Sequence, residues 1–432
     1  MAAPGFLQLL KQNPNYRYTW MGQVVSEVGD HFNTIAVFSL ALANTGSGLV
    51  VSALMLSRAI PAVMAGPLAG ILLDRLDRKQ IMIWSDLIRA AVAVLFIFAV
   101  GRNDPNVLYL LSGLLMFASP FFTSGRASIL PTITSREELH TANTLTQTTQ
   151  WTALTLGSFL GGASVVHFGY EWAFVFNSLS FLFSAWSISR LRVERGFRAV
   201  REALTENEVV RPWSEYAQGL RYMIGTPLLL AIGLVHVGWA TGGGAAQVLF
   251  PLFGEVVFRG GPGGIGALWG CAGVGLLLGG ALVYRLGPRL SFEGYRRAVT
   301  VCYIIHGSSY VLFALSPQFW QALVFIAISR GAVAVSSVLN FSQLLRHVPD
   351  NFRGRVFSTI ESLTWSMMMV SMTGAGFASE RVSPRAIGVA AGCLSSLTAV
   401  MWSWFHLTGR LVEPERAGVD PKEVEVHGDP ER

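Results

Sequence analysis

Residues 48–79 read GLVVSALMLSRAIPAVMAGPLAGILLDRLDRK, and this stretch combines the two features that decide the fold. Its first part, residues 48–73, is an apolar run long enough to cross the roughly 30 Å hydrocarbon core of a bilayer as a helix. Its second part, residues 74–79, is a short turn rich in Arg, Lys and Asp. An apolar run that ends in a basic turn is typical of a transmembrane helix whose end faces the cytoplasm.

The same pattern extends over the whole chain. Of its 432 residues, 52% are hydrophobic and only 13% are charged, whereas an average soluble domain has about 25% charged residues. This composition excludes a disordered chain and disfavours a soluble protein. We predict an all-α membrane protein with twelve transmembrane helices, at about 18–43, 48–73, 80–101, 106–125, 143–168, 171–191, 227–257, 263–285, 297–316, 319–342, 355–380 and 385–408.

The distribution of Lys and Arg predicts the orientation. With the N-terminus placed in the cytoplasm, 25 of these residues fall on cytoplasmic segments, 4 on the opposite side and 3 within spans. Such an asymmetry is the positive-inside signal of an integral membrane protein, and we expect both termini to be cytoplasmic. An error of one span would invert every later loop, so the asymmetry also supports the number twelve.

A long polar segment, residues 192–226, divides the predicted spans six and six. Within it, residues 212–223 could form a short amphipathic helix at the membrane surface. The two halves repeat weakly, since GILLDRL at 70–76 resembles GALVYRL at 280–286. We therefore predict two pseudo-symmetric six-helix bundles, and the domains are residues 1–191, a cytoplasmic linker at 192–226, residues 227–408, and a disordered cytoplasmic tail at 409–432.

The turn after the second span is the strongest local motif. Gly66 and Gly70 lie one helical turn apart, so another helix could approach this face closely. Asp74 could accept hydrogen bonds from the N-terminus of a neighbouring helix, where the dipole is positive. We interpret the motif as a conformational latch, braced by a nearby i, i+3 pair, although an ordinary basic turn would also fit. Its residues are Gly66, Gly70, Asp74, Arg75, Arg78, Asp86 and Arg89.

At residues 70–79 the sequence resembles the major facilitator superfamily, whose loop between helices 2 and 3 carries Gly-x-x-x-Asp-Arg-x-x-Arg-Lys/Arg. The second half departs from this pattern, because Tyr284 stands where an acid would be. Further stretches are similar to the macrolide-efflux and enterobactin-exporter branch: RAIP at 58–61, SDLIR at 85–89, RASILP at 126–131, ELHTAN at 138–143 and VPDNFRGRV at 348–356. The resemblance covers about residues 15–408 and implies export with proton antiport across a bacterial cell (inner) membrane.

Charged residues inside the predicted spans are functional candidates, because each costs at least about 2.5–3.5 kcal/mol at a helix centre. We expect Asp30 to pair with Arg58, and Glu27 or Asp30 to exchange a proton during transport, since carboxyl groups in low-dielectric sites can do so near neutral pH. A permanent structural ion pair is the alternative. The full set is Glu27, Asp30, Arg58, Arg330 and Glu361, of which Glu361 could also be a partner of the latch.

The seventh span contains three consecutive glycines, Gly242–Gly244, and Pro251. Both residue types weaken helices, and a broken helix at membrane depth must lie beside protein or a water-filled cavity. We therefore predict a substrate cavity here, although close helix packing would also explain the glycines. Its candidate residues are His236, Trp239, Gln247 and, from the tenth span, Asn340.

Motifs for enzymatic chemistry are missing from the sequence. None of its three lysines follows a glycine, which excludes a phosphate-binding loop of the Gly-Lys type. The string GPGGIG at 261–266 matches the dinucleotide fingerprint only in its letters, because it lies in a predicted exterior turn without a preceding strand. We expect no enzyme activity, no cofactor and no bound metal ion.

These observations and the resemblance together predict a secondary transporter that works by alternating access. We expect proton-coupled efflux of a hydrophobic or amphipathic small molecule, such as an antibiotic, siderophore or metabolite. The expected partners are this substrate, protons and membrane lipid, with no nucleic acid, and the expected state is a monomer. Alternatives are a transporter of lysophospholipids or metal ions, and a sensor or scaffold of the same fold that transports nothing.

Overall fold

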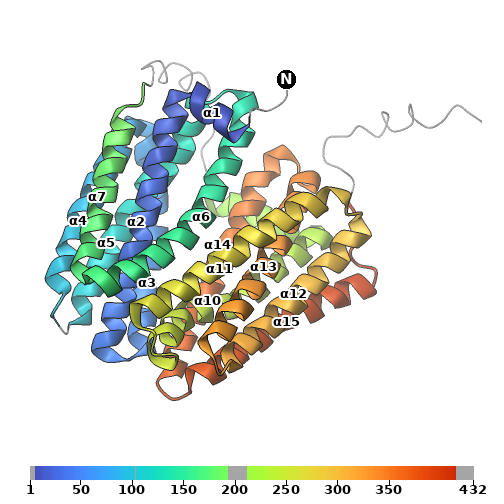
Figure 1. Cartoon of the computed structure of the whole chain (residues 1–432). Helices are drawn as coiled ribbons and strands as arrows, with labels where there is room; N and C mark the ends of the chain where they lie inside the picture. Colours follow the sequence, from blue (N-terminus) through green and yellow to red (C-terminus); the bar gives the residue numbers. More distant parts are fainter. Residues whose placement is uncertain (1–4, 103, 193–211, 415–432) are drawn as a thin grey trace, which may run out of the picture.

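The computed structural model describes residues 5–102, 104–192 and 212–414, and every regular element in this part of the chain is a helix (Figure 1). The first half contains α1 (Phe6–Gln12), α2 (Pro14–Thr45), α3 (Gly48–Arg75), α4 (Arg78–Leu95) with the 3-10 turn η1 (Phe96–Ala99), α5 (Pro105–Ile133), α6 (Arg136–Phe168) and α7 (Tyr170–Ser189). The second half contains α9 (Pro212–Gly225), α10 (Pro227–Leu252) with the π-turn η2 (Phe253–Val257), α11 (Gly261–Leu286), η3 (Gly287–Arg289), α12 (Phe292–Leu315), α13 (Phe319–His347), α14 (Asp350–Ser379) and α15 (Pro384–Leu407).

Polar caps set the ends of these helices. The side chain of Ser47 accepts from the Val50 amide at the start of α3, and Asp77 accepts from two amides at the start of α4. Such caps satisfy backbone donors that have no partner within the helix. Helix α2 is capped at its C-terminal end by Gly46, whose φ of 63° is left-handed and is accessible to glycine without strain.

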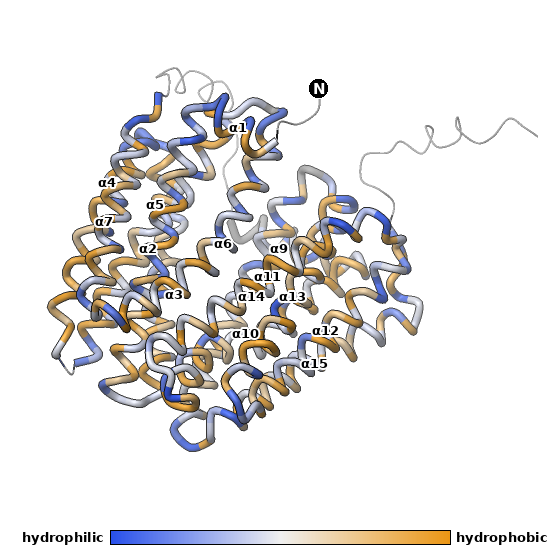
Figure 2. Tube along the Cα trace, in the orientation of Figure 1, coloured by the Kyte–Doolittle hydropathy of each residue, from blue (hydrophilic) through white to orange (hydrophobic). Residues whose placement is uncertain are grey.

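Twelve of the helices are long, six in each half, and they coincide with the twelve predicted spans. Nine of them are apolar enough to cross a membrane by length and composition. The other three, α2, α6 and α14, are 32, 33 and 30 residues long but carry more polar side chains. Figure 2 shows hydrophobic residues along the middle of both bundles and hydrophilic residues gathered at their ends, as expected for a protein that spans a bilayer.

Each half folds into a six-helix bundle with the same internal contacts. In the first bundle, α2 packs against α6 and α7, α3 against α5, and α4 against α5 and α7. In the second bundle, α10 packs against α14 and α15, α11 against α13, and α12 against α13 and α15. The two sets are identical when α2–α7 are matched in order with α10–α15, which confirms the pseudo-symmetry that the short sequence repeat predicted.

The two bundles meet mainly through two helix pairs, α6 with α11 and α3 with α14. Small residues allow the first pair to approach closely. A side-chain carbon at Gly266 of α11 would lie 2.5 Å from the carbonyl oxygen of Ser158 on α6, and one at Gly162 of α6 would lie 2.8 Å from that of Pro262. The glycine-rich string at 261–266 is therefore a helix-packing motif.

The contact between the bundles is closed at one end and open at the other. We call the end with the turn at Gly46 the distal face, and the end with α1 the terminal face. Three hydrogen bonds join the bundles toward the distal face: Ser47 Oγ donates to Glu380 Oε1 (2.7 Å), Ser52 Oγ to the Met372 carbonyl (2.8 Å) and Ser39 Oγ to Glu255 Oε2 (2.9 Å).

Toward the terminal face the bundles diverge (Figure 1). There, no described atom of another helix lies within 4 Å of where a side chain would begin at Gly66 or Gly70. The expected close approach of another helix to this glycine face is therefore not present in this arrangement.

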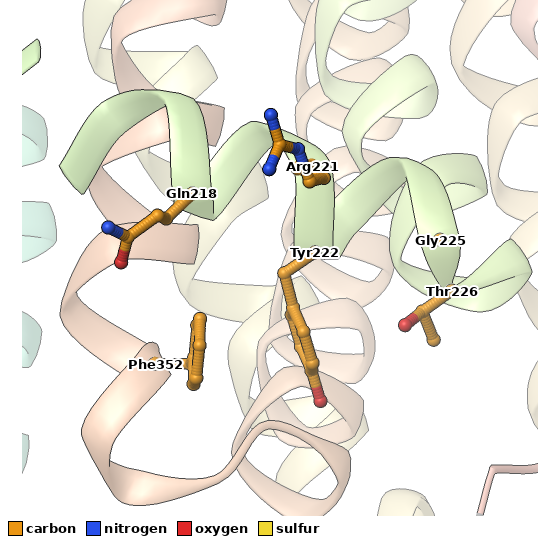
Figure 3. A pocket seen from close by; sticks show the side chains of 6 residues that line it. All are labelled: Gln218, Arg221, Tyr222, Gly225, Thr226 and Phe352. Atoms are coloured by element: carbon orange, nitrogen blue, oxygen red, sulfur yellow. The ribbon is translucent and has the colours of Figure 1, made fainter. Parts of the chain in front are cut away.

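Helix α9 covers the predicted amphipathic segment and packs against α14 and α10 of the second bundle. Figure 3 shows its side chains around a hollow at the end of α14. The rings of Tyr222 and Phe352 stack with centroids 4.8 Å apart, and Arg355 donates to the amide oxygen of Gln218 at 2.8 Å. These contacts attach the end of the linker to the second bundle.

Candidate functional site

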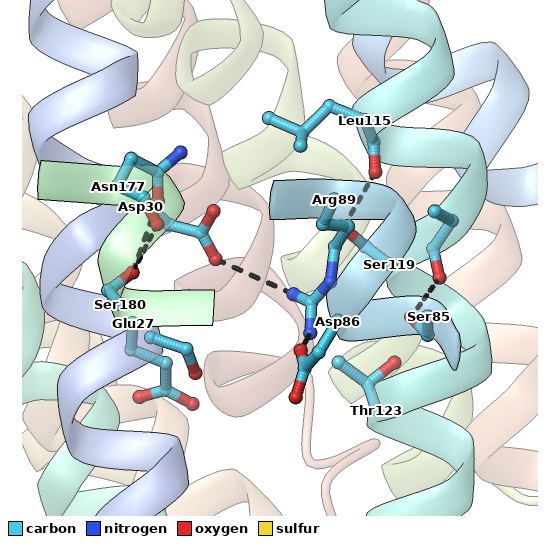
Figure 4. Close-up of polar contacts among 12 residues, drawn as sticks. Glu27, Asp30, Ser85, Asp86, Arg89, Leu115, Ser119, Thr123, Asn177 and Ser180 are labelled. Atoms are coloured by element: carbon cyan, nitrogen blue, oxygen red, sulfur yellow. Dashed lines mark hydrogen bonds and ion pairs between the residues drawn. The ribbon is translucent and has the colours of Figure 1, made fainter. Parts of the chain in front are cut away.

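A cluster of charged side chains lies inside the first bundle, between α2 and α4 (Figure 4). Arg89 of α4 forms an ion pair with Asp86, one turn earlier on the same helix. Its other terminal nitrogen, Nη1, lies 4.0 Å from Oδ2 of Asp30 on α2. The side chain of Arg89 is 3% exposed and that of Asp86 is fully buried, whereas that of Asp30 is 28% exposed. Asp30 is therefore the member of the cluster that a proton or a ligand can reach most easily.

Arg89 is held in place by aromatic rings. Its guanidinium carbon lies 4.3 Å from the ring centre of Phe181 on α7 and 4.7 Å from that of Phe122 on α5. Such cation–π contacts stabilise a desolvated guanidinium. One oxygen of each carboxylate, Oδ1 of Asp30 and Oδ2 of Asp86, has no hydrogen-bond partner among the described residues. Two carboxylates therefore share one cation, and one of them could carry a proton without leaving Arg89 unpaired.

A second ion pair lies nearly one turn along α2. Glu27 Oε1 is 3.0 Å from Nη1 of Arg126 on α5, and the amide nitrogen of Gln23 also donates to it at 3.0 Å. Because Glu27 and Asp30 are three residues apart, they lie on the same side of α2. This face of α2 therefore presents two partly exposed carboxylates, each beside an arginine from another helix.

The expected ion pair between Asp30 and Arg58 is not present. Arg58 Nη2 donates instead to the hydroxyl of Thr34 at 3.1 Å, and that hydroxyl donates to the backbone carbonyl of Asp30 at 2.7 Å. The rotation of α2 and α4 about their axes brings Arg89 to the carboxylate. The sequence contains both arginines, and it does not specify which helix face meets Asp30.

The predicted latch residues divide into two separate groups. Asp74 and Arg75 are exposed at the terminal face, while Arg78 Nη1 donates to the Ser128 carbonyl of α5 at 2.7 Å and fixes the turn to its own bundle. Asp86 and Arg89, which we expected to brace this turn, form their ion pairs elsewhere. They lie 8 and 11 residues beyond the start of α4, about 12 and 16 Å along it, and belong to the cluster around Asp30.

The two charged candidates of the second bundle, Arg330 and Glu361, form no ion pair with each other. Glu361 of α14 is exposed, and it has no hydrogen bond or ion pair within the described part of the chain. Arg330 of α13 is only 8% exposed. No group of three His, Cys, Asp or Glu residues among those described is arranged to hold a metal ion.

Helix α10 is continuous through its three glycines, so the predicted break at Gly242–Gly244 is absent. A side chain at Gly242 would collide with Ala391 and Ser395 of α15, and one at Gly244 with Met368 of α14. The glycines therefore serve close packing. The irregular backbone lies further on, where η2 forms a π-turn directly after the end of α10, two residues beyond Pro251.

The four predicted cavity residues have different surroundings. Trp239 and Gln247 are half-buried, and neither the indole Nε1 nor the Gln247 amide has a hydrogen-bond partner among the described residues. His236 uses Nδ1 for the carbonyl of Ile232, at 2.8 Å. Asn340 is not on a cavity wall, because it is fully buried and accepts a hydrogen bond from the hydroxyl of Tyr295 at 2.9 Å.

The sequence reasoning missed a polar link near the distal face. Ser39 of α2 is fully buried, and its hydroxyl donates to Glu255 of η2 at 2.9 Å and lies 3.3 Å from the hydroxyl of Tyr170 on α7. Glu255 thus connects the second bundle to α2 of the first bundle through Ser39, which also contacts α7. An acid within the apolar run 227–257 was the signal that could have revealed it.

Comparison with known proteins identifies related chains. The family model described as transmembrane secretion effector matches residues 9–423. A putative bacilysin exporter of Bacillus subtilis is 26% identical over 351 residues, which cover 81% of this chain and 84% of the relative. Macrolide efflux protein A of Streptococcus pyogenes is 26% identical over 402 residues, covering 91% and 92%.

A solved structure has the same fold. The inward-facing structure of a bacterial homologue of the iron transporter ferroportin superposes with a TM-score of 0.68, covering 93% of this chain and 100% of the other, at 17% identity. The major facilitator fold is thereby confirmed. The resemblance to macrolide-efflux and enterobactin-exporter proteins is confirmed as well.

Proposed function

This chain belongs to the transmembrane secretion effector family of the major facilitator superfamily, and from that premise we propose that it exports a hydrophobic or amphipathic small molecule in exchange for protons. Membership makes it an integral membrane transporter of small molecules rather than an enzyme. The identity of the coupling ion, the direction of transport and the class of cargo belong to the proposal. The cargo would be an antibiotic, a siderophore or a metabolite.

The proposal places the terminal face in the cytoplasm of a bacterial cell. Its support is the asymmetric distribution of Lys and Arg, with 25 residues on segments of this side and 4 on the other. In this orientation the bundles meet on the exterior side and diverge on the cytoplasmic side. Cargo would therefore enter the space between the bundles from the cytoplasm.

The single observation that carries proton coupling is the sharing of Arg89 by two carboxylates. With both carboxylates ionised, the group of Asp30, Asp86 and Arg89 has one negative charge in excess. A proton on Asp30 would neutralise the group and leave the closer pair of Asp86 and Arg89 intact. This group can therefore exist inside the bundle in two charge states, with Asp30 ionised or protonated. The two conformations of the transporter can then differ in their affinity for this proton, which couples the proton to the conformational change.

Alternating access requires the three hydrogen bonds near the distal face to break while the terminal face closes. Gly66 and Gly70, which face open space, are the part of α3 where a helix of the second bundle could then approach. Asp74 and Arg75 at the end of α3 would become the latch of that closed state. Trp239 and Gln247, with unpaired polar atoms, are the proposed cavity residues, Trp239 by stacking and Gln247 by hydrogen bonding.

The experiment that tests this function uses everted membrane vesicles. A growth-inhibition panel containing a macrolide, enterobactin and bacilysin, with and without the protein, first identifies a cargo. Cargo uptake driven by an acidic lumen is then compared for the native chain, Asp30→Asn and the exposed control Glu171→Gln. We expect normal membrane expression of all three proteins and loss of pH-driven uptake in Asp30→Asn alone.

Two results would contradict the proposal. Uptake by Asp30→Asn at the native rate would eliminate the coupling role of this residue. Cargo binding without any flux in reconstituted vesicles would instead identify a sensor or scaffold of the same fold.

A further inference from the structure

Helices α3 and α14 run antiparallel, and their contacts near the distal face show which side of each helix is turned toward the other. A side-chain carbon at Gly48 of α3 would collide with Ser379 of α14. One turn further along α3, Ser52 Oγ donates to the carbonyl of Met372 at 2.8 Å. Higher residue numbers on α3 therefore lie opposite lower residue numbers on α14.

Glu361 lies on the side of α14 that faces α3. It precedes Ser379 by 18 residues, which is five full turns of an α-helix, so both residues point in the same direction. Helix α14 is continuous over this distance and contains no proline. By the same relation, Gly66 is in line with Gly48 on α3. Glu361 and Gly66 are thus at matching levels on two opposed helices.

At this level the two helices are separated by open space. No described atom of another helix lies within 4 Å of a side-chain carbon placed at Gly66 or at Gly354, which precedes Glu361 by two turns on the same side of α14. Glu361 is exposed, and so are Val63 and Pro67 beside Gly66 on α3. The bundles diverge from here toward the terminal face (Figure 1). The walls of this space are therefore apolar on α3 and carry a carboxylate on α14.

Glu361 differs from the other carboxylates deep inside the described helices. Glu27, Asp30 and Asp86 each lie beside an arginine. Glu361 forms no hydrogen bond or ion pair with any described residue. Water can solvate its charge while the terminal face is open. Closure would bring the carboxylate against the apolar turn around Gly66, where an uncompensated charge is costly. A bound cation would remove this cost.

An aromatic side chain follows this carboxylate along the helix. Trp365 lies one turn beyond Glu361 on the same side of α14, and it is 43% exposed. The face of an indole ring attracts cations, so an acid and an indole on one helix face together favour a positively charged ligand. The apolar wall of α3 favours a ligand whose charge is carried on a hydrophobic body. A hydrated metal ion lacks such a body.

We propose that Glu361 and Trp365 form a binding site for hydrophobic cations in the space between α3 and α14. The inference deepens the proposed function, on which it rests for transport, because it names the class of cargo. A cargo that neutralises Glu361 would allow the terminal face to close around it, so binding and closure would be linked. Glu361 would then serve the cargo, while Asp30 serves the proton.

The test measures ligand binding to the purified full-length protein in detergent by equilibrium dialysis. The probe is radiolabelled tetraphenylphosphonium, whose charge does not depend on pH. Tetraphenylborate has the same shape and the opposite charge, and tetramethylammonium has the charge without the hydrophobic rings. We expect saturable binding of tetraphenylphosphonium that is at least about 10-fold tighter than that of either comparison ion.

Substitutions at the two residues separate a ligand site from a structural role. Glu361→Gln should weaken the binding of tetraphenylphosphonium at least about 10-fold, whereas Glu361→Asp should keep it. Glu361→Lys should reverse the preference toward tetraphenylborate, a result that loss of structure cannot produce. Trp365→Leu should weaken the binding about 2- to 5-fold. Glu171→Gln and Trp320→Leu, which make the same changes at exposed positions elsewhere, should bind as the native chain does.

The proposal is overturned if Glu361→Gln binds tetraphenylphosphonium as tightly as the native chain, or if the native chain does not prefer this ion to tetraphenylborate. Binding of tetramethylammonium with equal affinity would also overturn it, because the ligand would then need no hydrophobic body. Uptake assays keep the two proposals distinct. Uptake of a panel cargo driven by an acidic lumen, without any binding of tetraphenylphosphonium, would leave export standing and remove the cation site. Binding that depends on Glu361, without pH-driven uptake of any cargo, would do the reverse.

Discussion

Replacing Arg89 with glutamine would test the charge cluster most directly. In the folded protein this arginine is the partner of both Asp86 and Asp30. The substitution Arg89→Gln leaves Asp86 fully buried and without a cation. It leaves Asp30 partly exposed, so that water can solvate part of its charge.

The size of the effect follows from the burial of each partner. Removing one member of a buried ion pair costs about 3–5 kcal/mol, because the remaining charge is desolvated and unpaired. The contact of Asp30 with Arg89 is longer, at 4.0 Å, and Asp30 is 28% exposed, so its loss adds at most about 1 kcal/mol. With an unfolding entropy of about 2.1 cal/mol/K per residue, 432 residues lose about 1 °C of midpoint temperature per kcal/mol.

We therefore expect Arg89→Gln to lower the midpoint by about 3–7 °C and Asp30→Asn to change it by no more than about 1 °C. The double variant Arg89→Gln with Asp86→Asn should recover most of the loss, since it replaces a charged pair with a neutral one. Thermal unfolding of the detergent-solubilised proteins, followed by tryptophan fluorescence, measures all four chains.

One pattern of midpoints would refute this reasoning. If Arg89→Gln were as stable as the native chain, the ion pair of Asp86 and Arg89 would not stabilise the fold in the way that we infer from its burial. If the double variant were less stable than Arg89→Gln alone, the loss would come from the cation–π contacts of Arg89 and not from an unpaired Asp86.

Two further predictions concern the distal link and the second bundle. Glu255→Ala removes the acceptor of the Ser39 hydroxyl. A hydrogen bond to a charged group contributes about 1.5–3 kcal/mol. Because this bond stabilises the closed distal face, its loss should raise the population with an open distal face about 10- to 100-fold. Maleimide labelling of a cysteine placed in the α3–α14 contact, in a chain without its native cysteines, measures this rise, and unchanged labelling would show that the bond does not hold the face closed. Asn340→Leu leaves the buried hydroxyl of Tyr295 without its acceptor and should destabilise the fold by about 1–3 kcal/mol, while the cargo panel in growth assays stays the same. If Asn340→Leu changed which cargoes are exported while the stability of the fold stayed normal, Asn340 would instead line the substrate cavity.

The positions of the helices could be predicted from the sequence because they depend on local properties. A run of about 20 apolar residues crosses a bilayer wherever it occurs, and caps such as Ser47 and Asp77 act within one helical turn. The charge asymmetry and the short repeat then gave the number of spans and the two halves. The continuous α10 shows the limit of such reasoning, because glycines weaken an isolated helix and yet pack well between α14 and α15.

The partners of the charged residues could not be predicted in the same way. The sequence marked Asp30, Asp86 and Arg89 as candidate residues, since charges inside a membrane are costly. It assigned Asp30 to Arg58, and it placed Asp86 and Arg89 in the latch, because distance along a helix says nothing about which face meets which neighbour.

The sequence by itself therefore determined the twelve helices, their two-fold repeat and the set of charged residues that lie within apolar runs, where a charge is costly. Only the tertiary structure decided that Arg89 joins two carboxylates, that Asn340 is buried, and that Arg330 has no counter-charge. The reason is physical. Hydrophobic length and capping act on neighbours in the chain, whereas pairing depends on how each helix is rotated about its axis, and that rotation is set by the packing of the whole bundle.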